Sequence, residues 1–183
     1  LRSSSAASDV YKRQALLAWS KWSELSEASS PESESEHHEN VIALFEEQVE
    51  KNPNQTAVVF RESAQIVETL SYAELNAKAN QVAHYLIAEG VTPDTLVALC
   101  VERSLEMIIG IWGILKAGGA YVPIDPNYPE KHIEHILDDS GVEIVLTSAE
   151  LLAELPFDEL QILPLDEGMW EGFLGDYSEE NTD

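Results

Sequence analysis

The sequence predicts an α/β fold in which a partial, mostly parallel sheet carries helices on its faces. From residue 40 onward, β-branched runs of strand length alternate with longer segments whose apolar residues have helical spacing. The run at residues 96–101, LVALCV, is apolar throughout, which is typical of a strand covered on both faces. Glycines and prolines separate these runs, and the resulting βαβαβαβ order implies right-handed crossovers between parallel strands.

Residues 1–39 differ in composition from the rest. We interpret residues 1–14, LRSSSAASDVYKRQ, as translated adaptor or assembly sequence that is not native, and exclude them from the fold. Residues 15–39 hold a short amphipathic piece and a Ser/Glu-rich tract that has too little apolar surface to order itself. We expect them to form a disordered or interdomain linker, with the folded portion spanning residues 40–183.

The first elements are a helix and a hairpin. The helix, residues 41–50, is followed by an Asn-Pro-Asn turn, and strands at residues 56–60 and 65–69 are expected to pair. The next helix has the clearest start in the chain, because Ser71 and Glu74 have the spacing of a capping box and Leu70 and Leu75 that of a hydrophobic staple. Its expected buried face consists of Leu75, Ala79, Val82, Ala83, Leu86 and Ile87, and Gly90 ends it.

The central unit is a strand at residues 96–101, a helix at 105–117 and a strand at 120–124. Ser104 can cap the helix, which should be largely buried, and Gly110 and Gly113 leave room for a neighbouring element. Gly118 and Gly119 can both take the positive φ that ends a helix. Beyond them we expect a helix at residues 130–139, whose inward side chains are Ile133, Ile136 and Leu137. A strand at 143–147, a short helix at 149–155 and a strand at 161–165 are expected to follow.

Charge and cysteine content exclude several classes of function. The net charge is −24 and no Lys or Arg follows Lys131, so nucleic acid and anionic membranes are not expected partners. The single cysteine, Cys100, excludes an internal disulfide and lies in an apolar run, where we expect a buried core residue. This composition fits a reducing cytoplasm, and no apolar stretch is long enough to span a membrane.

No catalytic, cofactor-binding or metal-ligating residue is assigned from the sequence. His132 and His135 lie one helical turn apart, but no third ligand accompanies them. The acids Asp138 and Asp139 are interpreted as surface or capping residues. The glycines fit neither GxGxxG nor the Walker spacing.

Three segments resemble one enzyme family in the expected order. The run LKAGGAYVPIDPNYP at residues 115–129 is similar to a core motif of the amino-acid adenylation domains of nonribosomal peptide synthetases, which belong to the adenylate-forming superfamily of AMP-dependent synthetases and ligases. The run LSYAELNAKANQVAHYLIAEGV, which starts at residue 70, resembles the opening motif of those domains and the helix that follows it. The run NVIALFEEQVEKNPNQTAVVF at residues 40–60 resembles their first segment.

The resemblance covers residues 40–166 and implies the truncated N-terminal part of the large subdomain of an adenylation domain. The parent enzyme would activate an amino acid with ATP and Mg²⁺ to an aminoacyl adenylate, and then load it onto the phosphopantetheine thiol of a carrier domain. An upstream condensation domain is a further implied partner. The family's phosphate loop, Mg²⁺ ligand, ribose-binding aspartate and C-terminal lysine have no counterpart in this sequence, so the fragment alone is expected to be inactive.

Two alternatives stay open. The first is a fragment of an acyl-CoA or fatty-acyl-AMP ligase, which shares the fold and the adenylation step; the run AYVPIDPNYP favours the amino-acid branch. The second is a non-catalytic interaction or docking segment in which the acidic ends matter more than the core.

Overall fold

The computed structural model describes residues 40–61, 63, 67–153, 160–166, 168, 170 and 172–182. The expectations for residues 1–14 and 15–39, and the division at residue 40, therefore stay predictions. The elements in chain order are α2 (Val41–Lys51), β1 (Thr56–Arg61), β2 (Val67–Ser71), α3 (Tyr72–Ala88), β3 (Leu96–Cys100), α4 (Leu105–Lys116), β4 (Ala120–Pro123), α5 (Glu130–Ser140), β5 (Ile144–Thr147), the 3₁₀ turn η1 (Leu151–Ala153), β6 (Gln161–Pro164) and the 3₁₀ turn η2 (Leu174–Asp176).

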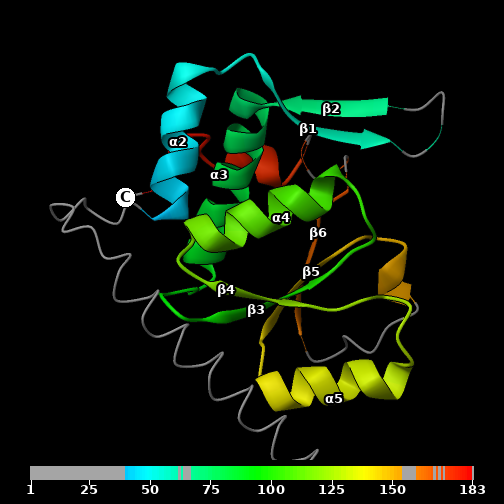
Figure 1. The fold of residues 1–183 in the computed structure, drawn as a ribbon. Coiled ribbons are helices and arrows are strands. Elements are labelled where there is room, and N and C mark those ends of the chain that lie inside the picture. The colour runs from blue at the N-terminus through cyan, green and yellow to red at the C-terminus, as the bar shows by residue number, and fades with distance from the viewer. Residues whose placement is uncertain are drawn as a thin grey trace, which may run out of the picture. The chain divides into compact units, whose positions relative to one another are not determined.

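The predicted parallel sheet is confirmed. It has four strands in the order β4-β3-β5-β6, and all its neighbouring strands run parallel. Val97 of β3 lies opposite Tyr121 of β4 and Ile144 of β5, which fixes the register of the centre. The predicted hairpin is also confirmed: β1 and β2 pair antiparallel as a separate two-stranded sheet that projects beside the helices (Figure 1).

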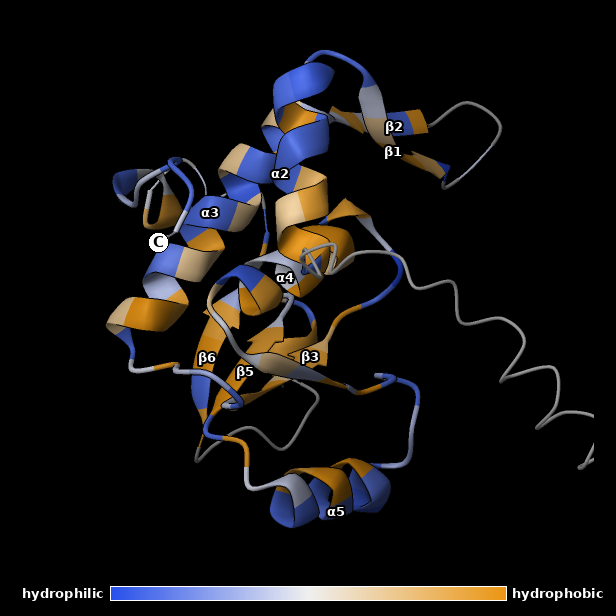
Figure 2. Ribbon diagram, turned by 60° about the vertical axis from the view of Figure 1, so that its left-hand side comes forward, coloured by the Kyte–Doolittle hydropathy of each residue, from blue (hydrophilic) through white to orange (hydrophobic). Residues whose placement is uncertain are grey.

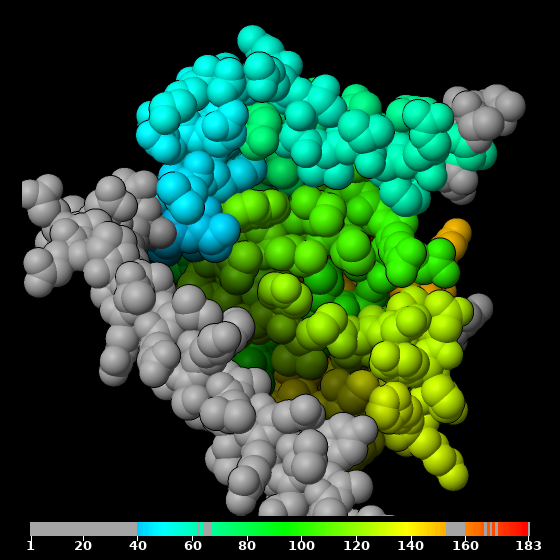
Figure 3. All heavy atoms as spheres, viewed as in Figure 1, coloured from blue at the N-terminus to red at the C-terminus, as the bar shows by residue number. Residues whose placement is uncertain are grey.

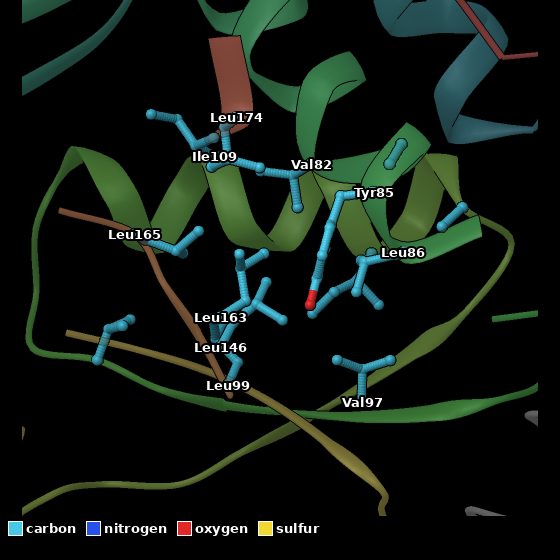
Figure 4. Packing of buried hydrophobic residues seen from close by; sticks show 14 of the residues in the cluster. Val82, Tyr85, Leu86, Val97, Leu99, Ile109, Leu146, Leu163, Leu165 and Leu174 are labelled. Carbon is cyan, nitrogen blue, oxygen red and sulfur yellow. The ribbon is translucent and has the colours of Figure 1, made fainter. Parts of the chain in front are cut away.

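Helices cover both faces of the parallel sheet. Helices α3 and α4 lie on one side and α5 lies on the other, with its apolar stripe turned toward the strands (Figures 1 and 2). Alternate residues of β3 enter different cores, since Val97 and Leu99 pack under α3 and α4 whereas Ala98 and Cys100 pack toward α5. The main core joins strand residues to Val82, Tyr85 and Leu86 of α3 (Figure 4).

The start of α3 forms as the sequence predicts. The Ser71 side chain accepts a hydrogen bond from the Glu74 backbone N–H at 3.3 Å, and the Glu74 carboxylate accepts from the Ser71 backbone N–H at 2.8 Å. One expected core residue of α3 is wrong: Ile87 is 45% exposed, and Tyr85 is buried instead. One residue rotates an α-helix by about 100°, so Ile87 lies beside the buried face that Leu86 occupies.

Helices α3 and α4 are in close contact at Gly113. A Cβ atom there would lie 2.4 Å from Val82 Cγ1, closer than any real contact. Gly110, one turn earlier, faces Leu99, whose Cδ1 would lie 2.9 Å from an added Cβ. Both glycines therefore have the packing role that the sequence predicts.

The paired glycines after α4 have different roles. Gly118 takes a φ of 84°, which favours glycine at the end of a helix. Gly119 does not have a positive φ, so that expectation is wrong. Its requirement is space, because an added Cβ would lie 3.1 Å from the Thr95 carbonyl oxygen, which accepts a hydrogen bond from Ala120 N–H.

Two later elements differ from their predicted form. The helix expected at residues 149–155 is the short 3₁₀ turn η1, and residues 154 and 155 lie outside the described residues. In α5, Ile133 and Leu137 are buried as predicted, whereas Ile136 is only half-buried.

Lys116, in the last turn of α4, is a buried cation that the sequence did not reveal. Its side chain has no exposed surface and donates to the carboxylate of Glu46 on α2. Burial lowers the pKa of Lys116, and the Glu46 carboxylate opposes that shift. The amide oxygen of Asn181 lies 3.4 Å from the ammonium group, so the C-terminal segment shares this polar contact.

The C-terminal segment is held on α3 and α4 by side-chain hydrogen bonds. The Asn181 amide oxygen also accepts from Asn76 Nδ2 at 2.9 Å and Asn80 Nδ2 at 3.1 Å. The Thr182 hydroxyl donates to the Lys116 carbonyl oxygen at 2.9 Å. These bonds join residues far apart in the chain, for example Asn80 and Asn181 at a separation of 101.

We expect Gly113→Ala to destabilise the chain by roughly 1–3 kcal/mol, because the new methyl group must displace Val82. Gly168→Ala is the matched control, since an added Cβ there meets no atom of the described residues within 4 Å. Urea unfolding midpoints measure both. Equal midpoints would contradict the close packing of α3 on α4.

Ser71→Ala should cost about 1 kcal/mol at neutral pH through loss of the N-cap. The Ser71 hydroxyl, and then its backbone N–H, lower the pKa of Glu74 in the folded chain. Stabilisation by this carboxylate is therefore complete above its unfolded pKa of about 4.3 and is lost as pH falls through the folded value. Unfolding free energies measured from pH 7 to 3 should show a shrinking penalty for Ser71→Ala; a penalty that grows in acid would contradict the capping box.

Glu46→Ala should destabilise far more than Glu47→Ala, although both remove one carboxylate from α2. Removing one partner of a fully buried ion pair costs about 3–5 kcal/mol, and the cost here should be somewhat lower because the Glu46 side chain is 24% exposed. Glu47 pairs with Lys51 on the surface, where such a pair contributes about 0–1 kcal/mol. Thermal or urea unfolding would rank the two variants, and an equal effect would show that Lys116 does not depend on Glu46.

Candidate functional site

The carboxyl ends of the four parallel strands meet at one edge of the sheet. In the strand order β4-β3-β5-β6, the connection that follows β3 leads outward to β4 at one end of the sheet. The connection that follows β5 leads outward to β6 at the other end, so the two connections diverge between β3 and β5. Ligands of open α/β sheets bind beyond the carboxyl ends of the strands at such a divergence. Two neighbouring pockets lie at this edge.

The larger one, the hairpin pocket, has a volume of about 750 Å³. It lies between the end of β1 and the loops that follow β3 and β4; in the space-filling view, the cyan hairpin stands above the green atoms of α4 (Figure 3). Its lining is mainly apolar and aromatic, with polar groups from three loops: Phe60, Arg61, Leu99, Val101, Glu102, Arg103, Met107, Ile111, Tyr121, Pro123, Ile124, Asp125, Pro126, Asn127 and Tyr128.

The turn after β4 shapes this pocket. Asp125 Oδ1 accepts from the Asn127 backbone N–H at 2.9 Å and from Asn127 Nδ2 at 3.0 Å, while Tyr128 N–H donates to the Asp125 carbonyl oxygen at 3.0 Å. The two bonds from Asn127 lower the pKa of Asp125, and the nearby Arg103 guanidinium adds a smaller effect. Asp125 is therefore an ionised turn residue whose carboxylate is already engaged within its own turn.

The smaller one, the carboxyl-end crevice, has a volume of about 300 Å³. It lies between the first turn of α4 and the loops after β5 and β6, and is lined by Val101, Glu102, Ser104, Glu106, Thr147, Ser148, Glu150, Leu151, Leu165 and Asp166. Ser104 Oγ caps α4 by accepting from Met107 N–H at 3.3 Å. Asp166 Oδ2 accepts from Ala149 N–H at 2.7 Å, which ties the two strand-end loops together. No sequence motif indicated this crevice; its signal in the sequence is a polar residue at or just beyond the end of each of the strands that border it.

Cys100, His132 and His135, to which the sequence assigns no functional role, lie outside the linings of these two pockets. Cys100 is fully buried, and burial raises the pKa of its thiol to about 11, with a further contribution from the Asp125 carboxylate. It is a core residue, as predicted, and carries too little thiolate to be a nucleophile. His132 and His135 are exposed on α5, and His132 lies edge-on to Tyr128 with ring centroids 5.0 Å apart.

Metal ligands and membrane spans can be judged only for the described part of the chain. No three His, Cys, Asp or Glu side chains converge there in an arrangement that could hold a metal ion. Among its helices, none combines the length and apolar character needed to cross a membrane.

Several synthases are among the curated proteins similar to this chain. Gramicidin S synthase 2 of Aneurinibacillus migulanus is 51% identical over 131 residues, which is 72% of this chain and 3% of that protein. Tyrocidine synthase 3 of Brevibacillus parabrevis is 55% identical over 109 residues, 60% of this chain and 2% of the synthase. Zwittermicin A synthase ZmaJ of Bacillus cereus is 48% identical over 131 residues, 70% of this chain and 24% of the synthase. The chain thus spans a small part of each relative.

Solved structures show the same fold. The nonribosomal peptide synthetase FmoA3 superposes with a TM-score of 0.69 at 30% identity, over 78% of this chain and 14% of that one. A fatty acid AMP ligase from Legionella pneumophila gives a TM-score of 0.66 at 25% identity, over 78% of this chain and 25% of that one.

The family of AMP-binding enzymes matches residues 45–171, from α2 to the segment beyond β6, so the match includes every strand of the parallel sheet and both pockets at its carboxyl edge. It extends over more than half of the chain, and this chain belongs to the AMP-binding enzyme family.

Proposed function

We propose that this chain is the N-terminal portion of an amino-acid adenylation domain of a nonribosomal peptide synthetase. The parent enzyme activates an amino acid by attack of its carboxylate on the α-phosphate of ATP, releases pyrophosphate, and passes the acyl group to the phosphopantetheine thiol of a carrier domain. The observation that supports this best is the 51% identity to gramicidin S synthase 2 over 131 residues. Identity at that level over most of the chain favours a shared activity more strongly than the fold does.

The run that first indicated the family has a definite place in the structure. Residues 115–129 form the end of α4, the strand β4 and the turn that closes the hairpin pocket. Gly118 and Gly119 let α4 stop and β4 begin beside β3 without a longer loop. The motif therefore has a structural role: it builds the carboxyl edge of the sheet.

The described residues do not fit ATP with Mg²⁺. The carboxyl-end crevice presents carboxylates and hydroxyls without a Lys or Arg, whereas triphosphate recognition needs cationic or backbone donors. The hairpin pocket has Arg61 and Arg103, but Glu102 and Asp125 lie in the same lining. We therefore propose that no catalytic, cofactor-binding or metal-ligating residue lies in this chain, and that ATP and Mg²⁺ bind to parts of the parent enzyme outside it.

Partners and location follow from the same proposal. A carrier domain and an amino acid are the parent's expected partners, and the linker at residues 15–39 would join an upstream condensation domain. We propose a cytoplasmic location, with neither nucleic acid nor a membrane as a partner. The net charge of −24 supports the absence of these partners, because it repels nucleic acid and anionic membrane surfaces.

A fatty-acyl-AMP ligase is the second candidate, supported by the TM-score of 0.66 to the Legionella pneumophila enzyme. Its identity is 25%, compared with 30% for the peptide synthetase FmoA3, so the peptide synthetase is favoured.

Exchange of labelled pyrophosphate into ATP tests the proposal. A polypeptide that joins this sequence to the remainder of its adenylation domain should catalyse exchange that depends on one amino acid, whereas the 183-residue chain should give no exchange above a heat-denatured control. Exchange that depends on a fatty acid would favour the second candidate. Absence of exchange with every substrate would favour the docking-segment alternative, and exchange by the 183-residue chain itself would show that it contains the active site.

A further inference from the structure

We propose that Asn181 is a latch residue that couples the docking of the C-terminal segment, residues 178–182, to the attachment of helix α2. The proposal goes beyond the adenylation reaction and does not depend on it. Helix α2 lies at the start of the family match, which covers residues 45–171, and the C-terminal segment lies just beyond its end. The coupling runs through the buried ammonium group of Lys116, which contacts both elements.

Polar side chains on one face of α3 bind the C-terminal segment. Asn80 and His84 are four residues apart and therefore lie on the same face of the helix. Asn80 Nδ2 donates to the Glu179 carbonyl oxygen at 2.6 Å, and His84 Nε2 donates to the Glu180 carbonyl oxygen at 2.9 Å. Both bonds hold the backbone of the segment, and the side chain of the next residue, Asn181, contacts α3 and α4 together.

Three donors converge on the side chain of Asn181. Its amide oxygen accepts from Asn76 Nδ2 at 2.9 Å and from Asn80 Nδ2 at 3.1 Å, and it lies 3.4 Å from Lys116 Nζ. Asn80 and the Lys116 side chain are completely buried, whereas Asn181 is exposed. The donors thus belong to the helices, and one exposed side chain of the segment supplies their acceptor.

The docked segment opens more easily than the core. Its residues are exposed or half-buried, and they form neither a helix nor a strand. The side-chain oxygens of Asn76 and Asn80 are buried without a partner among the described residues, which lowers the stability of the docked state. Segments with few buried apolar contacts open locally at a low free energy, so the segment can leave α3 while the core stays folded.

Helix α2 depends on the same ammonium group. The structure describes all residues of α2, and among them only Phe45 is buried, while Val41 and Leu44 are more than half exposed. The Glu46 carboxylate accepts a hydrogen bond from Lys116 Nζ, and the Phe45 ring centroid lies 5.9 Å from the same atom. Lys116 therefore provides two of the contacts that hold α2 on α4.

Loss of the Asn181 oxygen changes the surroundings of Lys116. A buried ammonium group needs acceptors in place of the water it has lost, and Glu46 and Asn181 both serve as such acceptors. When the segment leaves, water reaches the ammonium group and weakens its attraction to Glu46. Docking of the segment and attachment of α2 therefore favour each other. Any partner that draws residues 178–182 away from α3 loosens the helix at the start of the family match.

Hydrogen exchange of the 183-residue chain tests the coupling. Asn181→Ala should speed exchange of the α2 amides at least about fivefold, while the amides of α5, on the other face of the sheet, stay unchanged. Glu180→Ala is the matched control, because it truncates an exposed neighbouring side chain and keeps the carbonyl group that His84 binds; it should leave α2 unchanged. Unchanged α2 exchange in Asn181→Ala, or equal acceleration in α5, would overturn the proposal.

A second pair of variants tests whether the effect passes through the ion pair. Glu46→Gln should speed α2 exchange by itself, and adding Asn181→Ala should increase it by less than about twofold, since the contact that links them is already weakened. Glu47→Gln changes an exposed ion pair of the same helix and should leave the full effect of Asn181→Ala intact. Accelerations that multiply in the Glu46→Gln background would show that the segment and α2 act independently, and would refute the latch.

Discussion

The close approach of α3 to α4 at Gly113 is the constraint on which the rest of this structure depends. A side chain at this position would overlap Val82, so the two helices pack at a separation that only glycine permits. Helix α4 is also the crossover between β3 and β4, and α3 covers the same face of the sheet with Val82, Tyr85 and Leu86. One contact therefore sets the separation of α3 and α4 in the helical layer that covers this face of the sheet.

The last turn of α4 extends this layer by polar contacts. Lys116 pairs with Glu46 of α2 and meets Asn181 of the C-terminal segment, so one buried ammonium group connects three parts of the chain. Nearer the start of the helix, Gly110 packs against Leu99 and Leu165 and holds the first turn over the strand ends. The position of Ser104 and Glu106 beside the carboxyl-end crevice is thus a consequence of core packing.

The sequence predicted those features that depend on local chemistry. The capping box at Ser71, the strand pattern of β3 and the packing role of Gly113 follow from residue types at fixed spacing, and the structure confirms each. Features that depend on distant neighbours were missed or wrong. Ile87 was placed in the core because periodicity alone cannot tell where a buried face ends, and Gly119 was assigned a positive φ because sequence cannot show that Thr95 lies against it. A single lysine in an apolar helix was the only signal of the Lys116 ion pair.

The order of residues along the chain also explains why two pockets at one edge of the sheet differ in charge. The hairpin pocket draws its lining from residues 60–128, a stretch that still contains basic residues, and so includes Arg61 and Arg103. The carboxyl-end crevice draws on the loops after β5 and β6, which follow Lys131 and have acidic residues as their only charged ones. The parallel topology places these loops next to the loop after β3. Acidic residues that are far apart in the sequence therefore become neighbours at the edge of the sheet where the connections diverge. The difference in charge between the two pockets is therefore a result of topology acting on an uneven distribution of basic residues along the chain.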